Sequence, residues 1–228
     1  DAGLNQPELL EDLDLDGNPR VFNGTVDIGA DEFTMLTEAT VFLEGPYDAG
    51  AEKMTTLLAD TGRWRHDSPY ASHPGIPAGV TTGITDWVLL ELRAHPDQSL
   101  VASSVGLLKP SGQIVNSSGE AGVRLEASPG SYLLSIKHRN HLSIISQSPI
   151  AYTNAVVTYD FVASASQSHG GADAVKEVAP GIWAMKAGDA DGDGRVTLID
   201  RRIVNRQNGA IGYSPGDLNL DGVVDDND

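Results

Sequence analysis

The sequence predicts a mainly β protein whose C-terminal end forms a small α module. Three observations lead to this prediction. Runs of apolar, β-branched residues recur at short intervals, 25 glycines and 12 prolines provide many turns between them, and two aspartate-rich patterns of twelve residues stand near the C-terminus. Strands at this spacing, with turn residues between them, favour a β-sandwich for the middle of the chain.

The composition excludes several classes of function. A length of 228 residues suits one or two domains of about 150 residues each. The 15 basic and 32 acidic residues give a net charge of −17, which repels nucleic acids and anionic membranes. The lack of cysteine excludes thiolate metal sites, disulfides and a cysteine nucleophile. No apolar run approaches the roughly 18 residues of a membrane span, so we expect none.

The first 36 residues are polar, rich in Asp, Asn and Gly, and too few to bury a core of their own. The stretches DLDGNPR (14–20) and NGTVDIGA (23–30) resemble the closing coil of secreted bacterial right-handed parallel β-helix proteins. The resemblance implies that residues 1–36 form the terminal coil of a β-helix that lies mostly upstream. We therefore expect this sequence to be part of a longer protein.

Residues 37–165 are expected to form the β-sandwich domain. Apolar and β-branched runs predict strands at 39–45, 86–93, 131–138, 142–145 and 156–162. The polar stretch 47–85 has little periodicity and is long for a loop, so we expect an extended lobe or a segment that orders against a partner. Residues 166–187 begin rich in Ser, Gly and His and are expected to be a linker with a short packed lead-in.

Two features of the middle region have competing interpretations. Trp87 lies inside an apolar strand and is expected in the core, whereas Trp64 has polar neighbours and is the better candidate for an exposed sugar contact. The sequence HRNH at 138–141 is either a histidine metal site or a turn with structural hydrogen bonds. We favour the turn, because no acidic residue lies nearby in the sequence.

The strongest signal is a twelve-residue calcium loop of the EF-hand type at 189–200. Calcium takes about six to eight oxygen ligands, which such a loop supplies from alternating positions with glycine at position 6. Positions 1, 3, 5, 7, 9 and 12 are Asp189, Asp191, Asp193, Arg195, Thr197 and Asp200, and position 6 is Gly194. Arg195 is expected to contribute its backbone carbonyl, and Val196 at position 8 is expected to pair with another loop. Without metal the four carboxylates repel one another, so calcium binding and folding are expected to be coupled.

The same pattern recurs 28 residues later, at 217–228. The corresponding positions are Asp217, Asn219, Asp221, Val223, Asp225 and Asp228, with Gly222 at position 6. Two complete matches in tandem are a far stronger indication than one acidic turn, so we predict two Ca²⁺ sites. Between the loops, residues 200–208 are expected to form a short helix that Gly209 ends.

The tandem loops, the single short helix between them and the aspartate at position 12 resemble a type I dockerin. The resemblance covers 188–228 and implies a calcium-dependent module that docks into a cohesin domain. The residues at positions 10 and 11 differ between the repeats, being Leu198-Ile199 and Asp226-Asn227. A second helix is expected to begin at Asp228, so we expect the dockerin-like module to lack that helix here.

These features predict a calcium-stabilised, non-catalytic attachment or assembly region of an extracellular or cell-surface bacterial protein, with a cohesin-like protein as its partner. The sequence carries no His-Glu-x-x-His or phosphate-binding Gly-Lys motif. Two alternatives stay open. One is a self-assembling extracellular fibre or surface-layer subunit that binds further copies of itself. The other is the C-terminal tail of a polysaccharide-degrading β-helix enzyme, for which a polysaccharide is a further candidate partner.

Overall fold

A computed structural model describes residues 21–22, 25–26, 34–153 and 156–228, and these residues are mainly β. Two short strands, β1 (Val21–Phe22) and β2 (Thr25–Val26), pair antiparallel. Most of the expected β-helix coil at 1–36 lies outside the described residues. Within the described residues the strands form several small sheets, and neither a β-helix coil nor a closed sheet occurs.

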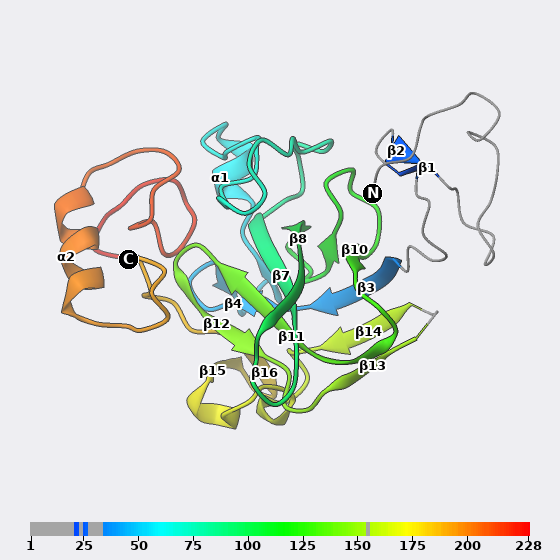
Figure 1. Cartoon of the computed structure of the whole chain (residues 1–228). Helices are drawn as coiled ribbons and strands as arrows, with labels where there is room; N and C mark the ends of the chain where they lie inside the picture. Colours follow the sequence, from blue (N-terminus) through cyan, green and yellow to red (C-terminus); the bar gives the residue numbers. More distant parts are fainter. Residues whose placement is uncertain (1–20, 23–24, 27–33, 154–155) are drawn as a thin grey trace.

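The largest sheet forms the centre of the β region (Figure 1). Its order is β12-β11-β7-β8-β9, with β13 paired to the start of β11, and all its pairs are antiparallel. The strands are β7 (Asp86–Arg93), β8 (Leu100–Leu108), β9 (Ile114–Val115), β11 (Gly130–His138), β12 (His141–Ile145) and β13 (Ile150–Tyr152). Every residue of β7 except Arg93 is buried, so this strand is covered on both faces, which explains its nearly continuous apolar sequence.

Two three-stranded sheets share the same core. One has the order β10-β3-β14 and the other β15-β16-β4, and in each the first pair is antiparallel and the second pair is parallel. Their strands are β3 (Thr34–Thr40), β4 (Phe42–Leu43), β10 (Val123–Glu126), β14 (Val157–Asp160), β15 (Val175–Ala179) and β16 (Ile182–Met185). The stretch 166–187, expected as linker and lead-in, therefore contains two strands. It also contains the short 3-10 helix η3 (Gly171–Asp173) and most of a second one, η2 (Ala165–Gln167).

The polar stretch 47–85 is a structured cover for the central sheet. It contains β5 (Tyr47–Asp48), β6 (Lys53–Met54) and α1 (Leu57–Asp60), and Leu58 is fully buried. Trp87 is buried, which confirms the core prediction. Trp64, the better candidate for an exposed sugar contact, does not provide one, because its ring stacks on that of Trp87 with centroids 5.8 Å apart and is 4 % exposed. The polar neighbours of Trp64 face outward while its ring closes one side of the core.

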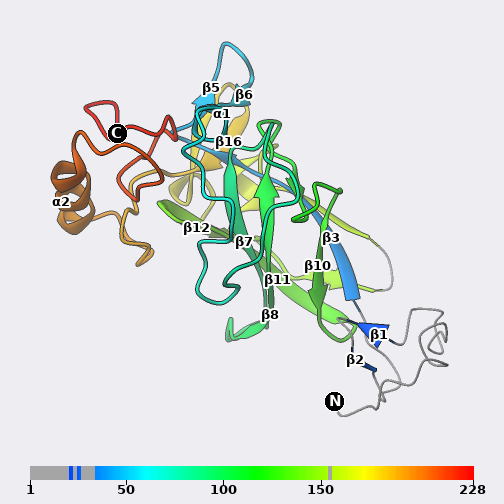
Figure 2. The same cartoon turned by 90° about the horizontal axis from the view of Figure 1, so that it is seen from above.

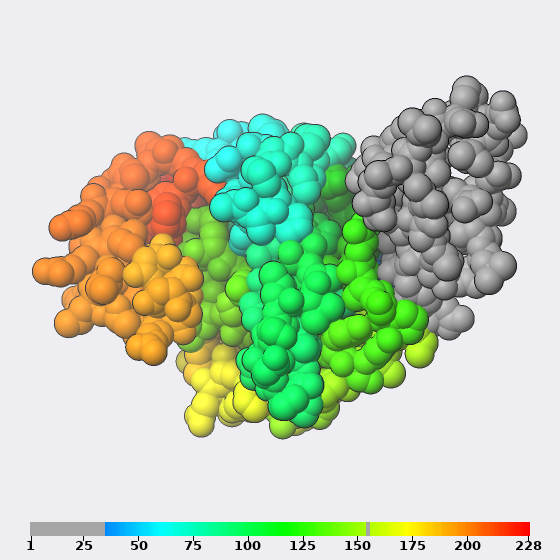
Figure 3. Space-filling view, in the orientation of Figure 1, coloured from blue at the N-terminus to red at the C-terminus, as the bar shows by residue number. Residues whose placement is uncertain are grey.

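The C-terminal module, residues 188–228, packs on one end of the β region (Figures 1 and 2). Its helix α2 (Leu198–Gln207) starts two residues before the expected 200–208, because Thr197 caps it and Asp200 completes a capping box. In Figure 3 the module's atoms lie directly against those of the α1 segment. Gly45 is one reason for the close fit, since a Cβ there would stand 2.0 Å from the Leu218 carbonyl oxygen. In the described part of the chain, none of the helices has the length and apolar character that a membrane span requires.

Candidate metal centre

The first loop brings three carboxylates together. Asp189, Asp191 and Asp193 each offer an oxygen, and these three oxygens lie within 4.8 Å of one another. Asp189 is only 2 % exposed, whereas Asp191 and Asp193 face solvent. Hard oxygen donors converging in this way suit Ca²⁺.

Backbone hydrogen bonds hold these carboxylates in place. The Gly194 N–H donates to Asp189 Oδ2 at 3.0 Å, and the Arg195 N–H donates to Asp193 Oδ1 at 2.8 Å. Asp191 Oδ1 accepts the Asp193 N–H at 3.1 Å. Gly194 has a φ of +85°, a conformation that glycine adopts at little cost, and this turn directs the N–H groups inward. Each carboxylate thus uses one oxygen for the loop and keeps the other for a ligand.

One atom of the first loop lacks a partner that a cation would supply. Asp189 Oδ1 is buried and accepts no hydrogen bond among the described residues. Burial and the nearby Asp200, Asp193 and Asp191 carboxylates raise the pKa of Asp189, while the Gly194 N–H lowers it. A buried acceptor without a partner costs stability, so this donor set fits a bound divalent cation.

Asp200 and Thr197 have roles that the ligand pattern alone did not reveal. Asp200 accepts N–H bonds from Asp191 at 3.2 Å and Thr197 at 2.7 Å. Burial raises the pKa of Asp200, but these hydrogen bonds lower it overall. Thr197 accepts the Ile199 N–H at 3.1 Å as the cap of α2. Position 12 therefore joins the loop to the helix, beside the cluster of three carboxylates.

The second loop repeats this network position by position. Gly222 donates to Asp217, Asp221 donates to Asn219, and Val223 donates to Asp221, at 3.1, 2.9 and 2.8 Å. Asp228 accepts the Asp225 N–H at 2.8 Å, as Asp200 accepts that of Thr197. Asp225 in turn accepts the Asn227 N–H at 2.8 Å, as a helix cap would. Both loops therefore share one backbone design, although Asn219 leaves the second loop with an amide at position 3 and without a cluster of three carboxylates.

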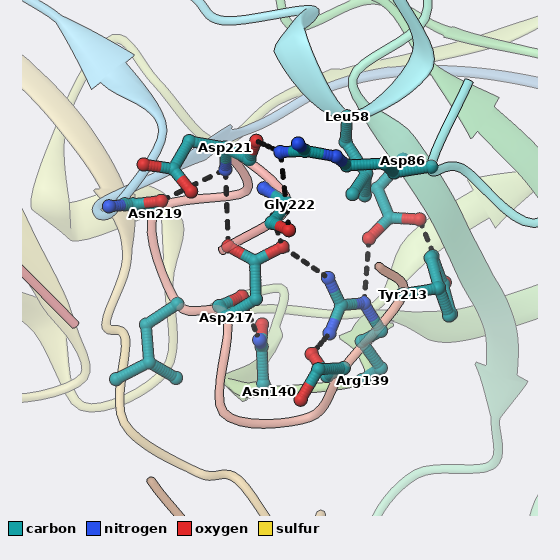
Figure 4. Close-up of polar contacts among 12 residues, drawn as sticks. Leu58, Asp86, Arg139, Asn140, Tyr213, Asp217, Asn219, Asp221 and Gly222 are labelled. Carbon is teal, nitrogen blue, oxygen red and sulfur yellow. Dashed lines mark hydrogen bonds and ion pairs between the residues drawn. The ribbon is translucent and has the colours of Figure 1, made fainter. Parts of the chain in front are cut away.

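The second loop lies against the β11–β12 turn, as Figure 4 shows. Asp217 is fully buried, and its Oδ2 stands 4.0 Å from the Nη2 of Arg139. The Asn140 side chain donates to the Asp217 carbonyl at 2.7 Å. Burial raises the pKa of Asp217 to about 7, although Arg139 and the Gly222 N–H lower it. Arg63 adds N–H bonds of 3.4 Å to the Asp221 and Gly222 carbonyls.

The turn at 138–141 makes structural hydrogen bonds, as favoured, but it also has an acidic partner that is distant in sequence. Its acidic partner is Asp86, which stands 52 residues away in sequence and 3.1 Å from His138 Nε2. Nδ1 of His138 lies 3.0 Å from Nδ1 of His141, and both rings are buried. Burial lowers the pKa of both histidines. Burial alone raises the pKa of Asp86, yet Arg139 and His138 depress it overall, so Asp86 is ionised.

Sequence reasoning missed the groups that join the two parts of the molecule. Arg139 Nε donates to Asp86 at 2.8 Å, its guanidinium lies 4.3 Å from the centre of the Tyr213 ring, and the Tyr213 hydroxyl donates to Asp86 at 2.8 Å. Asp86 and Tyr213 are 127 residues apart, so no local pattern connects them.

Several apolar side chains of the module face solvent. They are Val196, Leu198, Ile199 and Ile211, with exposed fractions of 55, 76, 55 and 70 %. The expected pairing of Val196 with the other loop is not found: Val224, its counterpart, instead bonds to Gly209 and Ala210 at 2.8 and 2.9 Å. A groove of about 450 Å³ runs beside α2, bordered by Val196, Val204 and Leu218 and by the position-12 residues Asp200 and Asp228.

Comparison with known proteins gives only a faint likeness. No protein-family model and no curated protein matches the chain. Among solved structures, the chain is similar to an N-terminal interface mutant of a type II Cohesin-X-Dockerin complex from Acetivibrio cellulolyticus. The sequence identity is 14 % and the TM-score 0.40, and the match covers 83 % of this chain and 88 % of that chain. A C-terminal interface mutant of the same kind of complex, from the same organism, matches at 13 % identity and TM-score 0.34, over 84 % and 88 %. Likeness at this level establishes neither a shared fold nor a shared partner.

Proposed function

We propose that residues 188–228 bind two calcium ions and form a non-catalytic, dockerin-like docking module. Through this module a bacterial extracellular or cell-surface protein would attach to a cohesin-like partner. The observation that carries the proposal is the buried Asp189 Oδ1, which has no partner among the described residues and lies beside two further carboxylates. The repetition of the same hydrogen-bond network in the second loop supports a second site.

Calcium in these loops would supply positive charge to carboxylates that the backbone has already oriented. Asp189, Asp191 and Asp193 would hold it in the first loop, with Asp200 at position 12. In the second loop the matching side chains are those of Asp217, Asn219, Asp221 and Asp228. Millimolar extracellular calcium fills even modest sites of this kind.

The docking part of the proposal is supported by the exposed apolar side chains. Leu198 and Ile199 stand at positions 10 and 11 of the first loop and open α2, so a bound ion would fix the position of this apolar face. Exposed apolar side chains gathered on a small module are typical of a protein-binding surface. A partner that covers Leu198 and Ile199 would therefore bind only the metal-loaded form well.

Calorimetric titration of the chelator-treated protein with calcium tests the metal sites. We expect two bound ions per chain and a rise in melting temperature, since a ligand at 100 times its Kd adds about 2.7 kcal/mol of stability. The double variant Asp193→Ala/Asp221→Ala should lose both effects. Asp97→Ala, an exposed aspartate in the β7–β8 turn, is the matched control and should keep them. Melting that is identical with calcium and with chelator in the wild type would overturn the assignment.

Light scattering with calcium and then with chelator tests what covers the apolar face. A monomer in both conditions, which binds purified cohesin domains only with calcium, supports the dockerin-like function. Leu198→Asp should then abolish that binding, whereas Leu57→Asp, an exposed leucine on α1, should not. Calcium-dependent growth into large species would support the self-assembling alternative instead. The polysaccharide-degrading alternative depends on an upstream β-helix and would be tested on the longer chain.

A further inference from the structure

The same turn of the β region holds the first ligand residue of both loops. The Asn140 carbonyl accepts the N–H groups of Gly188 and Asp189 at 3.1 and 3.2 Å, where the first loop begins. The Asn140 side-chain amide donates to the carbonyls of Pro215 and Asp217 at 3.1 and 2.7 Å, where the second loop begins. Asn140 is fully buried, so water does not compete for these bonds.

Arg139 adds a charged connection to the second loop. Its guanidinium spans Asp86 of strand β7, at 2.8 Å, and Asp217 of the loop, at 4.0 Å. It also donates through Nη1 to the Ser214 carbonyl and lies over the Tyr213 ring. Figure 4 shows Arg139 between these two carboxylates, with Asn140 beside it. The buried Asp86 thus fixes the cation that faces position 1 of the second loop.

The chain that leads into the first loop is fastened to the same hairpin. The Leu142 N–H donates to the Lys186 carbonyl at 2.8 Å, and His141 forms an antiparallel bridge with Ala187. Backbone at the start of each loop is therefore hydrogen-bonded to the 139–142 segment. The two loops are connected through Asn140, whose carbonyl binds the first loop and whose side-chain amide binds the second.

We propose that the Arg139-Asn140 turn couples the two calcium loops to each other and to the β region. Calcium bound at one loop orders this turn, which then holds the other loop in its binding conformation. By linkage, each ion raises the affinity of the other site by the same factor. The ions also stabilise the sheet that carries the turn. The inference rests on the proposed calcium binding and adds to it cooperativity and an identified connecting residue.

The affinity of the first site, with and without a functional second site, tests the coupling. Calorimetry on Asp221→Ala isolates the first site, which we expect to bind calcium at least about fivefold more weakly than in the wild type, the lower end of usual coupling factors. In the Asn140→Ala background, adding Asp221→Ala should no longer weaken the first site. Asn116→Ala is the matched control: Asn116 also accepts turn N–H bonds, from Ser118 and Glu120, but does not contact either loop. It should leave the coupling unchanged.

Tryptophan fluorescence gives a second readout, which starts from the wild type. All three tryptophans, at 64, 87 and 183, lie outside residues 188–228, so their emission reports on the β region. Calcium should raise the urea midpoint of tryptophan-monitored unfolding in the wild type. The shift should be smaller in Asn140→Ala and in Asn140→Asp, which keeps the side-chain size but loses the amide donor.

The outcomes separate the two proposals. Two bound ions, with a first-site affinity that Asp221→Ala does not change and no calcium-dependent shift in tryptophan-monitored unfolding, would overturn the coupling and leave calcium binding intact. A wild type that binds no calcium would overturn both.

Discussion

The two loops have nearly the same hydrogen-bond network but very different surroundings. Every residue from 191 to 199 in the first loop is exposed, whereas none from 217 to 225 in the second loop is. In the described part of the chain, the first loop's four carboxylates form no ion pair, while Asp217 faces Arg139. The same sequence motif therefore faces solvent in one copy and the β region in the other. If the proposed calcium binding holds, the first loop relies on the metal, whereas the second loop is largely supported by the β region.

The strongest test of this difference removes the buried cation. Arg139→Met leaves Asp86 buried without its cationic partner and removes the charge beside Asp217, so we expect a loss of about 3–5 kcal/mol in the free energy of unfolding. Urea denaturation with chelator present measures it. Arg65→Met is the control, because the Arg65–Asp67 pair is about half exposed and solvent screens its attraction, so its loss should change stability far less. Equal losses in the two variants would contradict the supporting role of Arg139.

Hydrogen exchange compares the loops directly. Adding calcium to about 100 times its Kd should raise the protection of the Gly194 and Arg195 amides by up to about 100-fold, or about 2.7 kcal/mol. The matched amides of Gly222 and Val223 should gain less, since their loop is already held by Asn140 and Arg63. Greater gains in the second loop than in the first would reverse the comparison.

The pH dependence of the metal-free protein should reveal the buried position-1 carboxylate. The pKa of Asp217 is raised to about 7 by burial, from 3.8. Between these two pH values the folded state holds a proton on Asp217 that the unfolded state releases. The protonated carboxyl therefore contributes stability that is fully present below about pH 4 and is lost as the pH rises through about 7. Asp217→Asn should remove this loss, so the variant should gain stability relative to the wild type between pH 5 and pH 8. Asp189→Asn should behave in the same direction but by less, because only a smaller rise in pKa applies there.

Much of this candidate site could be predicted from the sequence, because the residues of each loop are close together along the chain. Asp189, Asp193 and Gly194 stand within six residues, so their spacing alone fixes which side chains converge. The mainly β fold was predictable for the same reason, from short apolar runs between turns. The support for the second loop was not predictable, since Asp86 and Arg139 meet only through the pairing of β7 with β11. The burial of Trp64 also depends on tertiary packing, which local polarity does not reveal.

The smallest expected effect lies at position 4 of the loops, where the backbone has a positive φ in both copies. The first loop has Gly192 there, at +73°, and the second has Leu220, at +59°. Leu220 is fully buried in the core, so its packing offsets the strain of this conformation, whereas Gly192 is exposed and has no such compensation. Gly192→Ala should therefore cost about 1–2 kcal/mol of stability through strain alone, since the nearest atom to a new Cβ is 3.9 Å away. Denaturation with saturating calcium measures this cost, and a neutral result would show that the first loop tolerates strain without the packing that the second loop uses.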